Sequence, residues 1–148
     1  MSDSAADGHG GDDRSGMRRF YRIITGPTPI RADFLSDQDA GKPPPRNPDR
    51  VRYWRGRSFF ATVEAARDTI AARQERATAR GLMSPRAYIV EVTISPAAPI
   101  VYEQSGRNTE HYTLWGDADA LLTRVTDVLP GHPDDGDMDD GDVLPTME

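Results

Sequence analysis

The sequence predicts an α+β fold built on a mainly antiparallel sheet of five to six strands, with one long helix and one or two short helices. Two observations lead to this prediction. One helical pattern, at residues 62–80, is much longer than any other, and most strand patterns follow it in succession. A doubly wound sheet would instead alternate strands with helices. The sheet is expected to be either continuous or split around a ligand.

The charge distribution separates a mildly basic centre from two acidic ends. Of the net charge of −6, residues 1–16 carry −3 and residues 131–148 carry −7, which leaves +4 for residues 17–130. Both ends are rich in Gly, Asp, Ser and Pro, so they bury too little apolar surface to offset the entropy of ordering. We expect disordered acidic tails at 1–16 and 131–148 around a single domain at 17–130. Such a tail either keeps the protein in solution or covers a basic surface of its own domain.

Several classes of site and location are excluded by composition. The chain has no cysteine, which excludes disulfides and thiolate metal sites. Its apolar runs are too short for a membrane span and its N-terminus does not resemble a signal peptide, so we expect a cytoplasmic protein with no membrane partner. His111 is the only histidine inside the central domain, so no metal site is expected. Walker, dinucleotide-fold and HExxH motifs are also missing.

The first expected strand covers residues 18–25, because RRFYRIIT is rich in β-favouring side chains and Gly26-Pro27 follows it. Phe20, Arg22 and Ile24 then share one face. An arginine between apolar neighbours either extends to the edge of the sheet or points into a cleft where it meets an anion.

A short helix is expected at residues 30–40, with Gly41 immediately after its end. The next stretch, KPPPRNPD at 42–49, is expected to be an irregular or polyproline-type loop. Prolines at positions 27 and 29 hold the chain extended before the helix begins.

Arginines and aromatic rings alternate in residues 50–57. The side chains concerned are Arg50, Arg52, Tyr53, Trp54, Arg55 and Arg57. This pattern suits stacking on bases together with contacts to phosphates. Alternatively, Trp54 fills the core and the arginines stay in solvent. Gly56 allows a sharp turn or a close approach to a ligand.

A short strand at 58–61 is expected to lead directly into the long helix, for which Thr62 is the N-cap and Gly81 the residue after the C-terminus. Leu82 and Met83 are expected to pack back over the helix end. A narrow apolar stripe is formed by Val63, Ala66, Ile70 and Ala77. An ordinary solvated face is expected for Arg67, Asp68, Arg73, Glu75, Arg76 and Arg80.

The rest of the central region is mostly strand. Residues 86–94 show the clearest alternation, and further strands are expected at 100–103 and 110–115. A helical turn should begin near Asp117, and a final strand is favoured at 125–129.

The order FYRIITG, GRSFFATVEAAR, RAYIVEVTI and a late acidic residue resembles the layout of small bacterial ADP-ribosyltransferases, the rifampin-modifying enzymes in particular. This resemblance covers residues 18–129. It implies a split antiparallel sheet that holds NAD as a substrate and transfers ADP-ribose to an acceptor, which is a protein, a nucleic acid or a small molecule. No metal is implied.

The resemblance also implies roles for particular residues. Residues implied to bind NAD are Arg22, Arg57, Ser58, Phe60 and Thr62. Arg22 would hold a ribose or the phosphates and is also implied to be catalytic. Ser58, Phe60 and Thr62 would surround the nicotinamide, with the Phe60 ring stacking on it. Glu110, or as the second choice Glu103, would stabilise the oxocarbenium-like centre when nicotinamide leaves.

A second interpretation needs no catalysis. In it the domain is a binding module that contacts nucleic acid or a partner protein through the basic-aromatic segment Arg50–Arg57, and the acidic tail competes for that surface. Glu110 is then an exposed carboxylate, and His111 a half-buried imidazole that is bonded to the backbone.

Overall fold

The computed structural model describes residues 16–132. These residues form one six-stranded antiparallel sheet with the strand order β4-β5-β2-β1-β3-β6, which confirms the α+β prediction. The tails predicted at 1–16 and 131–148 lie outside the described residues, apart from positions 16, 131 and 132. In chain order the elements are β1 (Arg18–Ile24), η2 (Arg31–Phe34), η3 (Pro48–Arg50), α1 (Val51–Trp54), β2 (Arg57–Phe60), α2 (Val63–Ala79), β3 (Tyr88–Ile94), β4 (Val101–Gln104), β5 (His111–Trp115), α3 (Ala118–Leu122) and β6 (Val125–Pro130).

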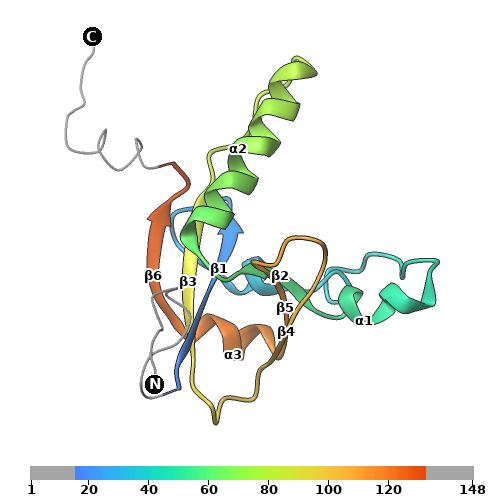
Figure 1. Cartoon of the computed structure of the whole chain (residues 1–148), viewed down its shortest axis with the longest axis vertical. Coiled ribbons are helices and arrows are strands. Elements are labelled where there is room, and N and C mark those ends of the chain that lie inside the picture. Colours follow the sequence, from blue (N-terminus) through green and yellow to red (C-terminus); the bar gives the residue numbers. More distant parts are fainter. Residues whose placement is uncertain (1–15, 133–148) are drawn as a thin grey trace.

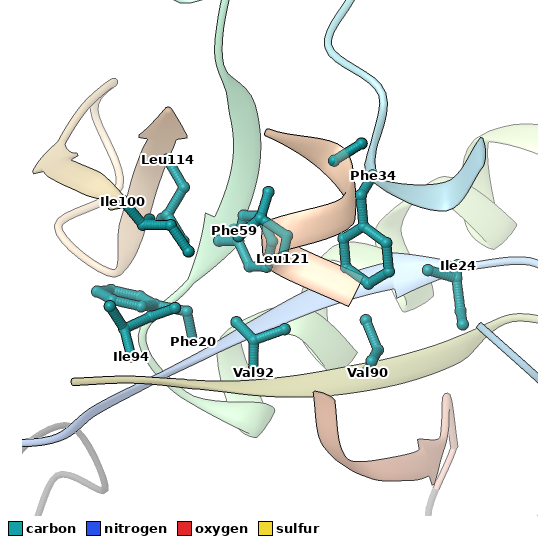
Figure 2. Packing of buried hydrophobic residues seen from close by; sticks show 11 residues of the cluster. Phe20, Ile24, Phe34, Phe59, Val90, Val92, Ile94, Ile100, Leu114 and Leu121 are labelled. Carbon is teal, nitrogen blue, oxygen red and sulfur yellow. The ribbon is translucent and has the colours of Figure 1, made fainter. Parts of the chain in front are cut away.

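The sheet lies between two helical layers (Figure 1). On one face the larger core cluster joins the strands to Phe34 of η2 and to Leu121 of α3, and Figure 2 shows these two side chains beside Phe59 of β2. On the other face a smaller cluster joins the strands to Ala66 and Ile70 of α2. The alternation of the strands separates the two clusters, because successive side chains point to opposite faces.

The long helix α2 begins as the sequence predicts, since the side chain of Thr62 accepts a hydrogen bond from the Ala65 backbone N–H at 3.1 Å. Its buried side chains, Ala65, Ala66 and Ile70, all lie in its first half. The second half extends past the sheet (Figure 1). Neither α2 nor any other helix within residues 16–132 is long and apolar enough to cross a membrane.

The C-terminal end of α2 is closed by Gly81, which has φ +72°. The Leu82 N–H donates to the Ala77 carbonyl at 2.8 Å, and the Gly81 N–H donates to the Thr78 carbonyl at 3.0 Å. These are the two bonds of a Schellman motif. The expected packing of Leu82 and Met83 over the helix end is wrong, because these side chains are 59% and 95% exposed. The position that Leu82 would cover holds Ala77, whose methyl group is too small to bury it.

The helix predicted at residues 30–40 is reduced to the short 3₁₀ helix η2. Leu35 already has an extended backbone, with ψ 139°. In a continuing helix the Gln38 N–H would donate to the Phe34 carbonyl, but it donates to the Trp54 carbonyl at 3.1 Å instead. At Gln38 a tertiary hydrogen bond has therefore replaced a local one, and residues 37–41 form a turn that is closed by its own backbone hydrogen bonds.

Candidate functional site

Strands β1 and β2 diverge, and Arg22 fills the gap between them. The two strands share a single residue pair, Tyr21 with Phe60, whereas β1 pairs with β3 along its whole length. Beyond that pair, Nη1 of Arg22 donates to the Ser58 carbonyl at 2.8 Å, and Nε donates to the Asp33 carbonyl at 2.7 Å. The guanidinium therefore satisfies a β2 carbonyl that a closed ladder would have paired with β1.

A second arginine, Arg57, contacts the same segment of the chain, the end of η2. Arg57 is only 5% exposed, its Nε donates to the Phe34 carbonyl, and its Nη2 lies 3.1 Å from the Asp39 carboxylate. Arg22 and Arg57 thus hold consecutive carbonyls at the end of η2, those of Asp33 and Phe34. These bonds fix the end of η2 against the sheet, and a space remains next to β2.

That space is a cleft of about 840 Å³. Its walls come from β1, β2, β5, α1, α2 and the loop at residues 35–45. A volume of this size lies within the range of roughly 300–1,000 Å³ that is typical of small-molecule sites. The lining residues come from both faces of the sheet, because α2 contributes Arg73 and Leu35 packs against the larger core cluster on the opposite face.

The cleft is strongly cationic. Among residues 16–132 its single acidic side chain is Asp37, which is paired with Lys42 at 3.4 Å. The cationic side chains that line it in this part of the chain are Arg22, Lys42, Arg50, Arg57 and Arg73. Arg57 is paired with Asp39, so Arg22, Arg50 and Arg73 have no ion-pair partner within these residues, an arrangement that favours an anionic ligand.

Arg22 and Arg57 lie near each other, and burial lowers the pKa of both side chains. Burial, and next the positive charge of Arg57, lower the pKa of Arg22 to about 10. Burial also lowers the pKa of Arg57, and the Asp39 carboxylate opposes that effect. Both side chains remain protonated at neutral pH. Within the described residues Nη2 of Arg22 has no hydrogen-bond partner, so this cation can still donate to a ligand.

A hydrogen-bonded group of side chains forms the wall next to β5. The Ser105 hydroxyl, which is nearly buried, lies 2.7 Å from the Thr113 hydroxyl and 3.0 Å from Nδ1 of His111. Nδ1 of His111 is also 3.1 Å from the Ser105 carbonyl. The imidazole meets the Phe60 ring edge to face, with centroids 5.5 Å apart. All four residues line the cleft.

The residues of the basic-aromatic segment 50–57 have two different roles. Some form structural contacts, and others line the cleft. Arg52 forms a two-point ion pair with Glu103, at 2.7 and 3.1 Å, and its carbonyl accepts from the Trp115 indole at 2.8 Å. Trp54 is half-buried, donates to the Lys42 carbonyl at 3.0 Å and lies outside both core clusters. Neither of the two alternatives drawn from the sequence describes the whole segment. Trp54 lines the cleft with Arg50 and does not fill the core, whereas Arg52 is already paired with Glu103.

The structure brings together four of the residues that the family resemblance implied. These four, Arg22, Arg57, Ser58 and Phe60, all line the cleft. Phe60 is only 6% exposed and belongs to the core beneath α2, so little of its ring is available for stacking.

Three other implied residues are not among those that line the cleft in the described chain. The Thr62 side chain serves as the N-cap of α2, and Glu103 is held by Arg52. Glu110 precedes β5 by one residue, and its carbonyl accepts from the Ala61 N–H at 2.8 Å. Because neighbouring side chains on a strand alternate, Glu110 and the cleft residue His111 point to opposite sides.

Some cleft residues were not selected from the sequence. Arg73 was assigned to a solvated helix face, and it is exposed as expected, but it also lines the cleft. It follows the buried Ile70 by three residues, and that spacing is a signal for its position. Ser105 and Thr113 carry no such signal, because they meet only through the pairing of β4 with β5.

Comparisons with protein-family models, with curated proteins and with solved structures found no match to this chain. Within residues 16–132 no group of three His, Asp or Glu side chains is placed to hold a metal ion.

Proposed function

We propose that the cleft binds a nucleotide that carries phosphate groups, with NAD as the specific candidate. The observation that carries the proposal is Arg22, a half-buried cation in the gap between β1 and β2 that lines the cleft and has no carboxylate partner within the described residues. Repulsion from Arg57 disfavours its charge, and an anion bound beside both would relieve that cost.

The charge of the cleft supports a phosphate or pyrophosphate over a neutral ligand. Five cations face it against one carboxylate, and arginine forms directed, charge-assisted hydrogen bonds to phosphate oxygens. Each such bond contributes about 1.5–3 kcal/mol. A few of them are enough for micromolar binding, which corresponds to about 8 kcal/mol.

The aromatic side chains support a ligand that also contains flat rings. Tyr53 and Trp54 of α1 and the His111 imidazole of β5 line the cleft. Aromatic rings next to cations suit a base or a nicotinamide joined to phosphates.

Transfer of ADP-ribose from NAD to an acceptor is the activity that the family resemblance adds to this proposal. It needs a carboxylate beside the ribose that loses nicotinamide. In the described chain Asp37 is the only acidic residue of the cleft, and Glu110 would have to turn its side chain across the strand to reach it. Binding and transfer are therefore tested separately, the first by calorimetry and the second by release of nicotinamide from wild type and from Glu110→Gln.

The binding test compares two arginines of the same helix. Both arginines are exposed on α2, but Arg73 lines the cleft and Arg76 is not among the lining residues. In titration calorimetry with NAD, Arg73→Gln should weaken binding roughly tenfold, equivalent to about 1.4 kcal/mol, while Arg76→Gln should bind as wild type does. Absence of NAD binding to the wild-type protein, or equal losses in the two variants, would contradict the proposal.

A further inference from the structure

The contacts of His111 define which of its nitrogens carries the proton. A carbonyl oxygen can only accept, so the 3.1 Å contact between Nδ1 and the Ser105 carbonyl requires a proton on Nδ1. The Ser105 hydroxyl, 3.0 Å from the same nitrogen, then accepts as well and can donate its own proton to Thr113 at 2.7 Å. The opposite tautomer would place two lone pairs against each other at the Ser105 carbonyl.

This tautomer leaves Nε2 of His111 as an unprotonated acceptor. Within the described residues Nε2 has no hydrogen-bond partner, and the imidazole belongs to the cleft wall. The ring cannot easily rotate away, because Ser105 holds one edge and the Phe60 ring packs against it. We infer that Nε2 of His111 is a binding point for a sugar hydroxyl, held in its acceptor form by Ser105.

The neighbours of His111 point to the class of ligand. The five cations of the cleft can only donate hydrogen bonds, and they suit the phosphates of a ligand. A ribose hydroxyl supplies the complementary donor that Nε2 requires. This inference rests on the proposed nucleotide binding and adds the position at which a ribose would be recognised.

The test uses two substitutions that separate the two nitrogens. The amide of asparagine lies near the position of Nδ1, so His111→Asn keeps a partner for Ser105 and removes the Nε2 position. The longer amide of glutamine reaches the Nε2 position instead. We expect His111→Asn to weaken NAD binding about three- to tenfold and His111→Gln to retain most of it. Inorganic pyrophosphate, which has no hydroxyl for Nε2, should bind equally to both variants and to wild type.

A second measurement uses the wild-type protein, so it does not depend on the folding of a variant. In wild-type protein labelled with ¹⁵N in its three histidines, the His111 imidazole should show a protonated Nδ1 and a bare Nε2. The Nε2 resonance should shift on saturation with NAD and stay in place with pyrophosphate.

The outcomes distinguish the two proposals. If wild type binds neither NAD nor pyrophosphate, the proposed nucleotide binding itself fails. If wild type binds both, and NAD binds His111→Asn as tightly as wild type, the ribose-binding role of His111 is overturned while nucleotide binding stands. A proton on Nε2, or an Nε2 resonance that NAD leaves unchanged, also overturns that role.

Discussion

Arg22 shows how one residue couples the fold to the candidate site. Its two hydrogen bonds, at 2.7 and 2.8 Å, join the loop carbonyl of Asp33 to the strand carbonyl of Ser58. A closed β1–β2 ladder would leave no room for this guanidinium. The same side chain that keeps the strands apart therefore supplies a central cation of the cleft.

Tyr21, on the opposite face of β1, makes the free energy of unfolding depend on pH in the alkaline range. Its hydroxyl donates to Glu91 at 3.1 Å, and burial followed by the Glu91 charge raises the pKa of Tyr21 to about 12 from 10.0. The folded protein binds this proton more tightly than the unfolded chain does. The resulting stability is fully present below pH 10 and is lost as the pH rises towards 12. Tyr21→Phe removes this loss.

The prediction is checked by thermal unfolding of both proteins between pH 7 and pH 12. At pH 7 Tyr21→Phe should cost about 1 kcal/mol, because the hydrogen bond to Glu91 is lost. Above pH 10 the two stability curves should converge. Tyr102→Phe, at a position on β4 that is 37% exposed, serves as the control and should run parallel to wild type. Parallel curves for Tyr21→Phe as well would show that Tyr21 does not control this pH dependence.

At the scale of elements, Gly56 sets the distance between the α1–β2 connection and β5. A Cβ atom at this position would lie 2.4 Å from Cγ2 of Thr113 and 3.0 Å from Nε1 of Trp115. Thr113 is nearly buried within a strand, so it cannot move aside without disturbing the hydrogen bond to Ser105. The absence of a side chain at Gly56 therefore allows β2 and β5 to pair next to the cleft.

Gly56→Ala should destabilise the protein by about 1–3 kcal/mol, as overpacking of a well-filled region usually does. Urea denaturation measures the change. The matched control is Gly26→Ala, because a Cβ at that position meets nothing within 4 Å. Equal midpoints for the two variants would mean that the contact with Thr113 is relieved at little cost.

Across the whole molecule, positive and negative charge are segregated. The cleft collects five cations, whereas residues 131–148 carry −7 and begin beside α2, where His132 lies 2.6 Å from Gln74. Opposite charges on one chain attract at low ionic strength and are screened at high ionic strength. The acidic end and an anionic ligand are therefore expected to compete for the same surface.

This expectation is tested on the full chain by replacing the six aspartates between 134 and 142 with asparagine, which changes the net charge from −6 to 0. NAD and pyrophosphate should then bind several-fold more tightly at 20 mM salt. The difference should vanish near 1 M salt, where the Debye length is about 3 Å. Equal affinities at both salt concentrations would favour the view that the tail only keeps the protein in solution.

The positions and types of most elements could be predicted because they depend on local patterns. All six expected strands and the capped helix α2 are present within a residue or two of the predicted bounds. The predicted helix at 30–40 failed because distant partners took its backbone hydrogen bonds, the Trp54 carbonyl in particular. Local propensity is a weak signal wherever tertiary hydrogen bonds compete with it.

For this protein the sequence by itself determined the α+β class and the order of the strands along the chain, and the family resemblance singled out Arg22, Arg57, Ser58 and Phe60, which line the cleft. Only the tertiary structure decided that Ser105, His111 and Thr113 line the cleft with them, and that Thr62, Glu103 and Glu110 do not line the described cleft. The physical reason is that alternation and helical spacing are local properties of a chain. Which polar groups meet depends on the register of β2 with β5 and on where the β1–β2 ladder opens, and both are set by contacts between residues far apart in sequence.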